Sequence, residues 1–345
     1  MAPRTIKVTL ETVTPLFLGG ADGRTPELRP PPFRGMMRYW FRALAGGVVG
    51  DDGQALKTIR QKEAEIFGSP DEKCGLSAVW VRLSTPDYSR GCTARVLPHR
   101  GDTWTNHRGQ TLRNRPQPAI PPGVTPTLTL TLKPGAEMQK LKMAVWSLLV
   151  GLTLGGVGKR SRRGLGSLQV AEMGELPPEL SGSLQQQLEQ ATKLSTGGED
   201  LARYIGGLLT AARSAFTTFL GNPIAPISDP PRFSLLGPDT HIVVWTPSNN
   251  SGTDYQTTLS ALMNKLSDLT RDHGKGNFAQ AFGGIGPRRA SPLWVSTHRL
   301  QNDGWALVLT HLKAQYLSNL AGNQHHLVTA FLDSPPGGWI KTEVE

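Results

Sequence analysis

One stretch of twelve residues decides the fold that we expect for this chain. It reads Gly155-Gly156-Val157-Gly158-Lys159-Arg160-Ser161-Arg162-Arg163-Gly164-Leu165-Gly166, so five glycines surround four cations. Glycines let a backbone approach a phosphate chain closely, and Lys and Arg neutralise phosphates. The stretch therefore indicates contact with an RNA or DNA backbone. The other interpretation is a solvated, flexible loop.

The elements around this loop predict one domain in the first half of the chain. Residues 137–154 have the periodicity of an amphipathic helix, and residues 165–170 read as a closing strand. Further upstream we predict a strand at 6–13, a helix at 33–49, a short helix at 55–67, and strands at 76–83, 92–97 and 127–132. This order matches a β-α-β-β-α-β ferredoxin-like unit with loop insertions.

The second half repeats the same alternation in a looser form. After a linker rich in Gly, Pro, Ser and Gln, we predict a helix at 200–220, a strand at 241–245, a helix at 257–271, strands at 293–300 and 305–312, and a helix at 313–320. The predicted fold class is therefore α+β, with two ferredoxin-like (RRM-like) domains over residues 1–173 and 174–345.

The positive charge is confined to the first half. Residues 1–175 hold 25 Lys and Arg against 14 Asp and Glu, whereas residues 176–345 hold 12 against 13. A basic half favours a nucleic-acid partner over a membrane surface, although a high pI without such a partner is the alternative. No apolar run is long enough to span a membrane, and the two cysteines, Cys74 and Cys92, form no disulfide framework. We therefore expect a cytoplasmic protein.

A second motif interleaves arginines with aromatic residues at a helix start. Arg34, Arg38 and Arg42 recur every four residues, so they should form one basic stripe on the helix. Tyr39, if exposed, would offer a ring on which bases stack. For the neighbouring Trp40 and Phe41 the alternative is packing in the core, which we favour. For Arg38 and Arg42 the alternative is a solvated helix face.

Several blocks of the sequence resemble a known family. They are Thr14-Pro15-Leu16-Phe17-Leu18-Gly19-Gly20, Glu27-Leu28-Arg29-Pro30, Phe33-Arg34-Gly35 and Arg38-Tyr39-Trp40-Phe41-Arg42. In this order they are similar to the start of the first RAMP subunit of Cmr complexes, the effectors of type III-B CRISPR systems. Two later blocks resemble further parts of that family, namely Glu65-Ile66-Phe67-Gly68-Ser69 and Phe282-Gly283-Gly284-Ile285-Gly286-Pro287-Arg288-Arg289-Ala290-Ser291-Pro292-Leu293. The stretch 155–166 resembles the glycine-rich loop of RAMP proteins.

This resemblance implies a non-catalytic, RNA-binding subunit of an antiviral RNA-guided complex. Such subunits lie near the 3′ end of the guide, contact guide or target RNA, and leave cleavage to a sibling subunit. The implied partners are CRISPR RNA, target RNA and other RAMP subunits of the Cmr complex, without a membrane or a cofactor. The RNA-binding candidates are Arg29, Arg34, Arg38, Arg42, Gly155, Gly156, Lys159, Arg160, Arg162, Arg163, Arg288 and Arg289.

We predict no catalytic residue and no bound metal. The sequence has neither a Gly-x-Ser-x-Gly elbow nor a His-Glu-x-x-His helix, and the pair His325-His326 has no acidic or cysteine neighbour. The alternative function is a metal-independent RAMP endoribonuclease that processes CRISPR RNA with His99 or His107. Both histidines lie in a long loop predicted over residues 98–125. That loop is either a basic arm that orders on RNA or a surface insertion without a role.

Overall fold

The computed structural model describes residues 4–22, 24–70, 75–84, 86, 91–96, 102–105, 109–221, 223–249, 254–283, 290–315 and 325–345. The helices are α1 (Pro30–Val49), α2 (Gly53–Phe67), α3 (Met138–Leu154), α4 (Ser183–Ala191), α5 (Gly198–Leu220), α6 (Tyr255–Phe282) and α7 (His325–Leu332). The strands are β1 (Thr5–Thr12), β2 (Val79–Ser84), β3 (Cys92–Ala94), β4 (Thr103–Thr105), β5 (Thr111–Arg113), β6 (Gln117–Ala119), β7 (Thr127–Leu132), β8 (Leu168–Met173), β9 (His241–Pro247), β10 (Leu293–Arg299), β11 (Trp305–His311) and β12 (Trp339–Glu343). No helix within these ranges has the length and apolar composition that a membrane crossing requires.

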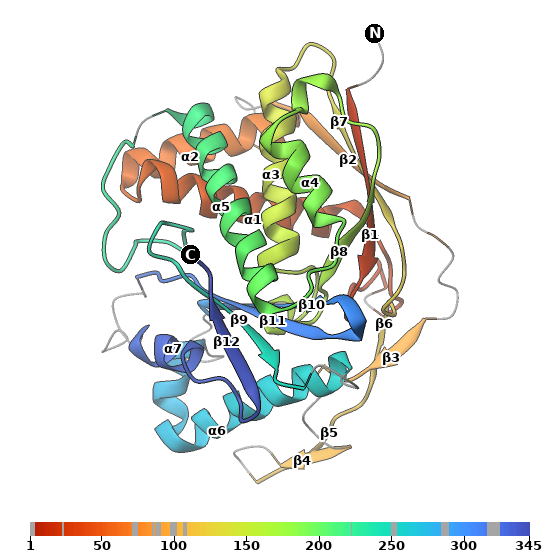
Figure 1. The fold of residues 1–345 in the computed structure, drawn as a ribbon, viewed down its shortest axis with the longest axis vertical. Helices are drawn as coiled ribbons and strands as arrows, with labels where there is room; N and C mark the ends of the chain where they lie inside the picture. The colour runs from red at the N-terminus through yellow and green to blue at the C-terminus, as the bar shows by residue number, and fades with distance from the viewer. Residues whose placement is uncertain are drawn as a thin grey trace.

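The first domain is built on one antiparallel sheet with the strand order β2-β7-β1-β8. The chain path through β1, α1, β2, β7, α3 and β8 with this order is the ferredoxin-like topology, and α2 is an insertion. In β7 the threonines are half-buried and the leucines are buried, because one face of the sheet packs on the helices and the other does not. Figure 1 shows α1 and α3 on that packed side of the sheet.

The second domain repeats the topology with a second antiparallel sheet, ordered β10-β11-β9-β12. Its path runs through β9, α6, β10, β11, α7 and β12, so both predicted ferredoxin-like units are confirmed. The helix predicted at 313–320 is contradicted at its start, and residues 316–320 lie outside the described residues. Residues 313–315 are not helical, and the helix of this position in the topology is α7, at 325–332.

The second sheet is covered on both faces. One face packs with α3 and α5 in the larger hydrophobic cluster, through residues such as Ile242, Val244 and Val308. The opposite face packs with α6 and α7 in a separate cluster, through residues such as Val243 and Leu309. Figure 1 shows this sheet between the two pairs of helices. Because both faces are buried, β9 and β11 read as continuous apolar runs rather than as alternating strands.

Between β2 and β7 the structure agrees with one part of the sequence-based prediction and corrects another. The strand predicted at 92–97 is present as β3 over residues 92–94, where it pairs with β6 in a separate two-stranded sheet, and the third strand of the ferredoxin-like unit is β7. Residues 98–125 were expected to be a loop, yet their described part contains the β4–β5 pair and β6. These strands have three residues each, which is too short for a periodic pattern to register.

The two domains are joined through β10, which lies against the stretch 155–166 and the end of α3. The Gly164 N–H donates to the Val295 carbonyl at 3.0 Å, and the Thr297 N–H donates to Ser167 Oγ at 2.9 Å. Ser296 Oγ donates to the Thr153 carbonyl at 2.5 Å. These groups are buried, so a shift of one domain along the other that broke these hydrogen bonds would leave polar groups unsatisfied away from water. The seam therefore fixes the relative position of the domains.

Candidate nucleic-acid interface

The basic loop, residues 155–166, has a defined conformation rather than that of a flexible segment. It closes on itself, because the Val157 N–H donates to the Gly166 carbonyl at 2.9 Å, and it is tied to the first domain, because the Lys159 N–H donates to the Phe17 carbonyl at 3.1 Å. Gly166 has a φ of +71°, and a Cβ atom there would stand 2.0 Å from the Val157 oxygen. Only glycine fits this position, and its role is to let the two ends of the loop meet.

The four cations of the loop divide into two pairs. Lys159 and Arg160 are exposed, whereas Arg162 and Arg163 turn into the seam between the domains. The Arg162 guanidinium lies 4.4 Å from the centroid of the Trp294 ring and donates to the Ser291 carbonyl. Arg163 Nη2 donates to the Phe282 carbonyl at 3.2 Å. Two loop arginines of the first domain therefore hold backbone carbonyls of the second.

This cluster carries positive charge in a partly dehydrated place. Burial lowers the pKa of Arg163 to about 10, and the nearby charges of Arg160 and Arg162 act in the same direction. Its Nη1 is buried and has no hydrogen-bond partner among the described residues. No described carboxylate forms an ion pair with any of the four cations. Because a desolvated cation without a counterion is unfavourable, the loop is suited to receive an anion.

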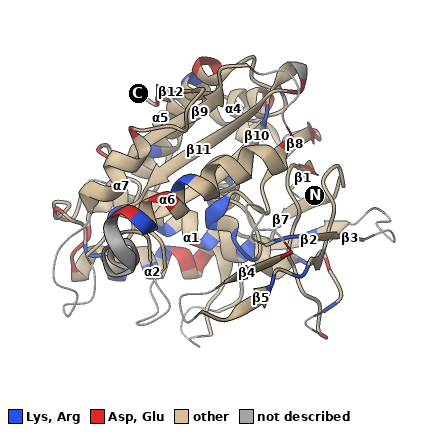
Figure 2. Cartoon of the chain, turned by 90° about the horizontal axis from the view of Figure 1, so that it is seen from below, with Lys and Arg blue, Asp and Glu red and all other residues tan. Residues whose placement is uncertain are grey.

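The predicted basic stripe on α1 is only partly available to a ligand. Arg34 is exposed, but Arg38 Nε and Arg42 Nη1 both donate to Glu63 Oε1, at 2.6 and 2.8 Å. Glu63 comes from α2, and its side chain is only 4% exposed. Figure 2 shows the blue stretches of α1 beside a red stretch of α2. Sequence reasoning missed Glu63 because nothing in the spacing of α2 marks it as the partner of both arginines.

Tyr39 is where the loop and the α1 stripe meet. Its ring centroid lies 5.4 Å from the Arg162 guanidinium and 4.7 Å from the Trp294 ring, and its hydroxyl accepts a hydrogen bond from Trp294 Nε1 at 3.0 Å. Tyr39 is thus half-buried, not the exposed platform considered from sequence. Trp40 and Phe41 are fully buried, in agreement with the core interpretation.

The remaining candidates are placed less centrally. Arg29 Nη2 donates to the Gly19 carbonyl at 3.0 Å, which ties down the chain before α1. Gly155 ends α3, and Gly156 packs against the Gly166 carbonyl. Arg288 and Arg289 lie outside the described residues, as do His99 and His107 of the alternative function.

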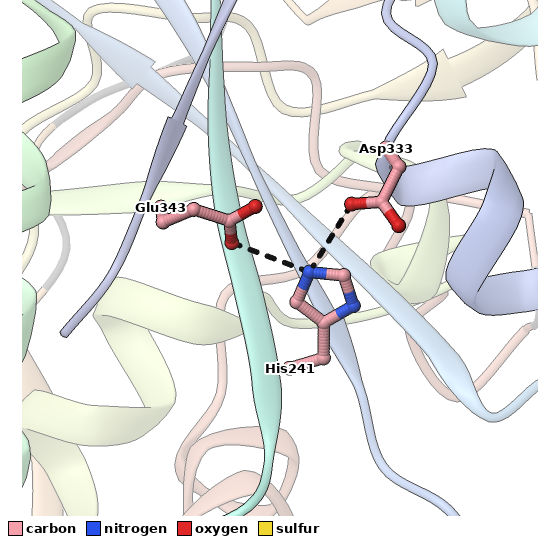
Figure 3. Close-up of side chains that lie close together, drawn as sticks. All are labelled: His241, Asp333 and Glu343. Carbon is pink, nitrogen blue, oxygen red and sulfur yellow. Dashed lines mark ion pairs between the residues drawn. The ribbon is translucent and has the colours of Figure 1, made fainter.

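A second cluster, His241, Asp333 and Glu343, has the residue types of a metal site. Figure 3 shows both carboxylates facing the imidazole, with His241 Nε2 3.6 Å from Asp333 Oδ1 and 3.3 Å from Glu343 Oε2. However, Lys341 Nζ lies 3.0 Å from the same Asp333 oxygen and 2.5 Å from Glu343 Oε1. An ammonium group of the protein itself already pairs with both carboxylates. The cluster is therefore an ion-pair network that fastens β12 and the end of α7 to β9.

The fold and the loop together define a class of protein. Its mark is a basic glycine-rich loop that precedes the last strand of a ferredoxin-like domain, and here the loop contacts a second such domain. That class is the RAMP superfamily, whose sequence pattern matches residues 9–169, from β1 to β8. The chain is 35% identical over 185 residues to the CRISPR system Cmr subunit Cmr1-2 of Pyrococcus furiosus, covering 48% of this chain and 95% of that protein. It is also 35% identical to Cmr1-1 of the same organism over 147 residues, covering 42% of this chain and 41% of that protein. The chain therefore belongs to the Cmr1 family of RAMP subunits.

Solved structures extend the likeness of the fold to both domains. The crystal structure of apo Cmr1 from Pyrococcus furiosus has a TM-score of 0.63 at 21% identity, covering 99% of this chain and 98% of that chain. A chain of the type III-B Cmr-beta complex bound to cognate target RNA and AMPPnP has a TM-score of 0.66 at 14% identity. The match covers 96% of this chain and 99% of that chain. At these identities the likeness concerns the fold.

Proposed function

We propose that this chain is a non-catalytic, RNA-binding subunit of a type III-B CRISPR effector complex, and that it contacts guide or target RNA near the 3′ end of the guide. Its partners would be other RAMP subunits of the Cmr complex. The Cmr1 subunits of Pyrococcus furiosus and the Cmr-beta complex bound to target RNA support the assembly. One observation supports RNA as the ligand: the loop carries two exposed and two half-buried cations, none of which forms an ion pair with a described carboxylate.

The direct test separates the two pairs of loop cations. The double variant Lys159→Ala/Arg160→Ala removes only exposed charges, so it should leave the melting temperature unchanged. Its affinity for single-stranded RNA, measured by fluorescence anisotropy, should fall on the order of tenfold, and the salt slope should decrease by about 1.4, because each single-strand phosphate contact contributes about 0.7. The charge-matched control is Arg203→Ala/Arg271→Ala, whose guanidiniums are exposed on α5 and α6. Equal affinity of the wild type and the loop variant would contradict the proposal.

The non-catalytic part of the proposal has its own readout. Purified protein incubated with CRISPR repeat RNA and a chelator should leave the RNA intact. Site-specific cleavage that disappears in His99→Ala or His107→Ala would favour the endoribonuclease instead. Mass spectrometry of proteins that co-purify with the chain tests the assembly, since other Cmr subunits should be present.

A further inference from the structure

A groove behind the α1 stripe contains two arginines that no motif identifies. The groove has a volume of about 720 Å³ and lies between α1, α2 and residues 232–234 of the segment that joins α5 to β9. Its lining includes Arg38, Tyr39, Arg42, Arg60, Arg232 and Phe233. Arg60 and Arg232 are exposed, and neither forms an ion pair with any residue in the described part of the chain.

The lining also includes three carboxylates, but the protein itself occupies them. Asp51 accepts hydrogen bonds from the Ser228 N–H at 3.1 Å and from the Arg232 N–H at 2.7 Å. Asp52 caps α2 by accepting from the Ala55 N–H at 2.7 Å, and Glu63 is the buried acceptor for Arg38 and Arg42. The lining therefore holds four arginines against three carboxylates, and its exposed guanidiniums, those of Arg60 and Arg232, can donate hydrogen bonds to an anion.

The opposite wall is aromatic and held firmly in place. The Leu236 N–H donates to the Ala43 carbonyl of α1 at 2.8 Å. The segment can approach so closely because α1 carries Gly46 and Gly47, where a Cβ atom would stand 2.8 Å from the Phe233 ring and 2.1 Å from the Leu236 oxygen. Phe233 is thus fixed as one side of the groove. Guanidiniums beside aromatic and aliphatic side chains form the chemical environment that nucleotides occupy on proteins.

The groove also adjoins the basic loop. Tyr39 lines the groove, and its ring is the one that contacts Arg162 of the loop. We propose that the groove is a second RNA-contact site, in which Arg60 and Arg232 bind phosphates of a single strand that continues from the basic loop past Tyr39. This inference rests on the proposed RNA-binding function and adds to it two contact residues and a path.

The test is the double variant Arg60→Ala/Arg232→Ala in the full chain. Both side chains are exposed, so the fold should persist and the melting temperature should match that of the wild type. With labelled single-stranded oligouridine we expect on the order of tenfold weaker binding and a salt slope smaller by about 1.4. Arg203→Ala/Arg271→Ala again removes two exposed charges elsewhere and should bind like the wild type.

The outcomes separate the two proposals. If the wild type fails to bind RNA, the proposed function fails. If the wild type binds, Lys159→Ala/Arg160→Ala weakens binding, and Arg60→Ala/Arg232→Ala does not, only the groove is refuted. Displacement of the RNA by micromolar AMP would overturn the assignment to a strand. If Arg60→Ala/Arg232→Ala kept its RNA affinity but no longer co-purified with the neighbouring Cmr subunits, the groove would bind an acidic protein surface instead. That result would also overturn the proposal.

Discussion

At the scale of single residues, the partner of each arginine decides what that arginine can do. Arg38 and Arg42 share Glu63, Arg162 is stacked on Trp294, and Arg163 donates to a carbonyl of the second domain. Arg34, Lys159 and Arg160 are exposed without such partners among the described residues. The basic residues thus include both structural cations and cations that are available to a ligand.

Glu63→Gln tests this division. The amide cannot pair ionically with Arg38 and Arg42, and we expect a loss of about 1–3 kcal/mol in the free energy of unfolding, as is typical for hydrogen bonds to charged groups. RNA affinity should rise or stay unchanged, because two guanidiniums become available. Urea denaturation and anisotropy measure the two effects, and Glu65→Gln is the control because Glu65 is more exposed and pairs with lysines. A fall in RNA affinity would show that the two arginines need Glu63 to be positioned for RNA.

At the scale of elements, the backbone of the basic loop is held in one conformation, like the strands around it. Its turns use glycines with positive φ, and Arg160 also adopts the left-handed conformation, with a φ of +63°. The loop is therefore held by its backbone hydrogen bonds and by the neighbouring residues 15–17. We expect this rigidity to preset the positions of the exposed cations before RNA arrives.

Gly166→Ala should disrupt that geometry. A left-handed alanine costs about 1–2 kcal/mol, and the contact of its Cβ with the Val157 oxygen at 2.0 Å adds further strain. We therefore expect a lower melting temperature and weaker RNA binding together. Gly35→Ala is the matched control, because no atom lies within 4 Å of a Cβ at this exposed position in α1, and alanine should stabilise the helix by about 0.5–1 kcal/mol. An unchanged melting temperature of Gly166→Ala would mean that the loop is not rigid.

At the scale of the whole molecule, the seam makes the two domains one unit. His298 of β10 is half-buried there, and its Nε2 donates to the Thr153 carbonyl at 2.8 Å. Burial lowers the pKa of His298 to about 4 from an ordinary value of 6.5, so the folded protein keeps this imidazole neutral. Burial likewise lowers the pKa of His311 to about 3.

These shifts predict stability that is lost on acidification. Above pH 6.5 His298 is neutral in both the folded and the unfolded protein, so its neutral form costs no stability. Between pH 6.5 and about 4 the imidazole gains a proton only in the unfolded chain, and the free energy of unfolding falls. One such histidine accounts for a loss of up to about 3 kcal/mol. In His298→Gln the decline in that window should be shallower, as followed by urea denaturation at several pH values, and His326→Gln on the exposed side of α7 should keep the wild-type profile. Identical profiles for His298→Gln and the wild type would refute this role.

The order of helices and strands was determined by the sequence itself. The periodicity of residues 6–13, 33–49 and 137–154 located β1, α1 and α3, and the apolar runs at 293–300 and 305–312 located β10 and β11. Such patterns arise because each element must bury one or both of its faces, and burial leaves its period in the chain. The three-residue strands β4, β5 and β6 left no such pattern.

Only the tertiary structure decided the strand order of each sheet and the fate of each cation. Glu63 reaches Arg38 and Arg42 from another helix, Trp294 reaches Arg162 from another domain, and Phe233 forms a groove wall with residues of α1 and α2. The physical reason is that a local pattern reports which face of an element is buried, whereas an ion pair or a ring contact depends on which other segment lies against that face.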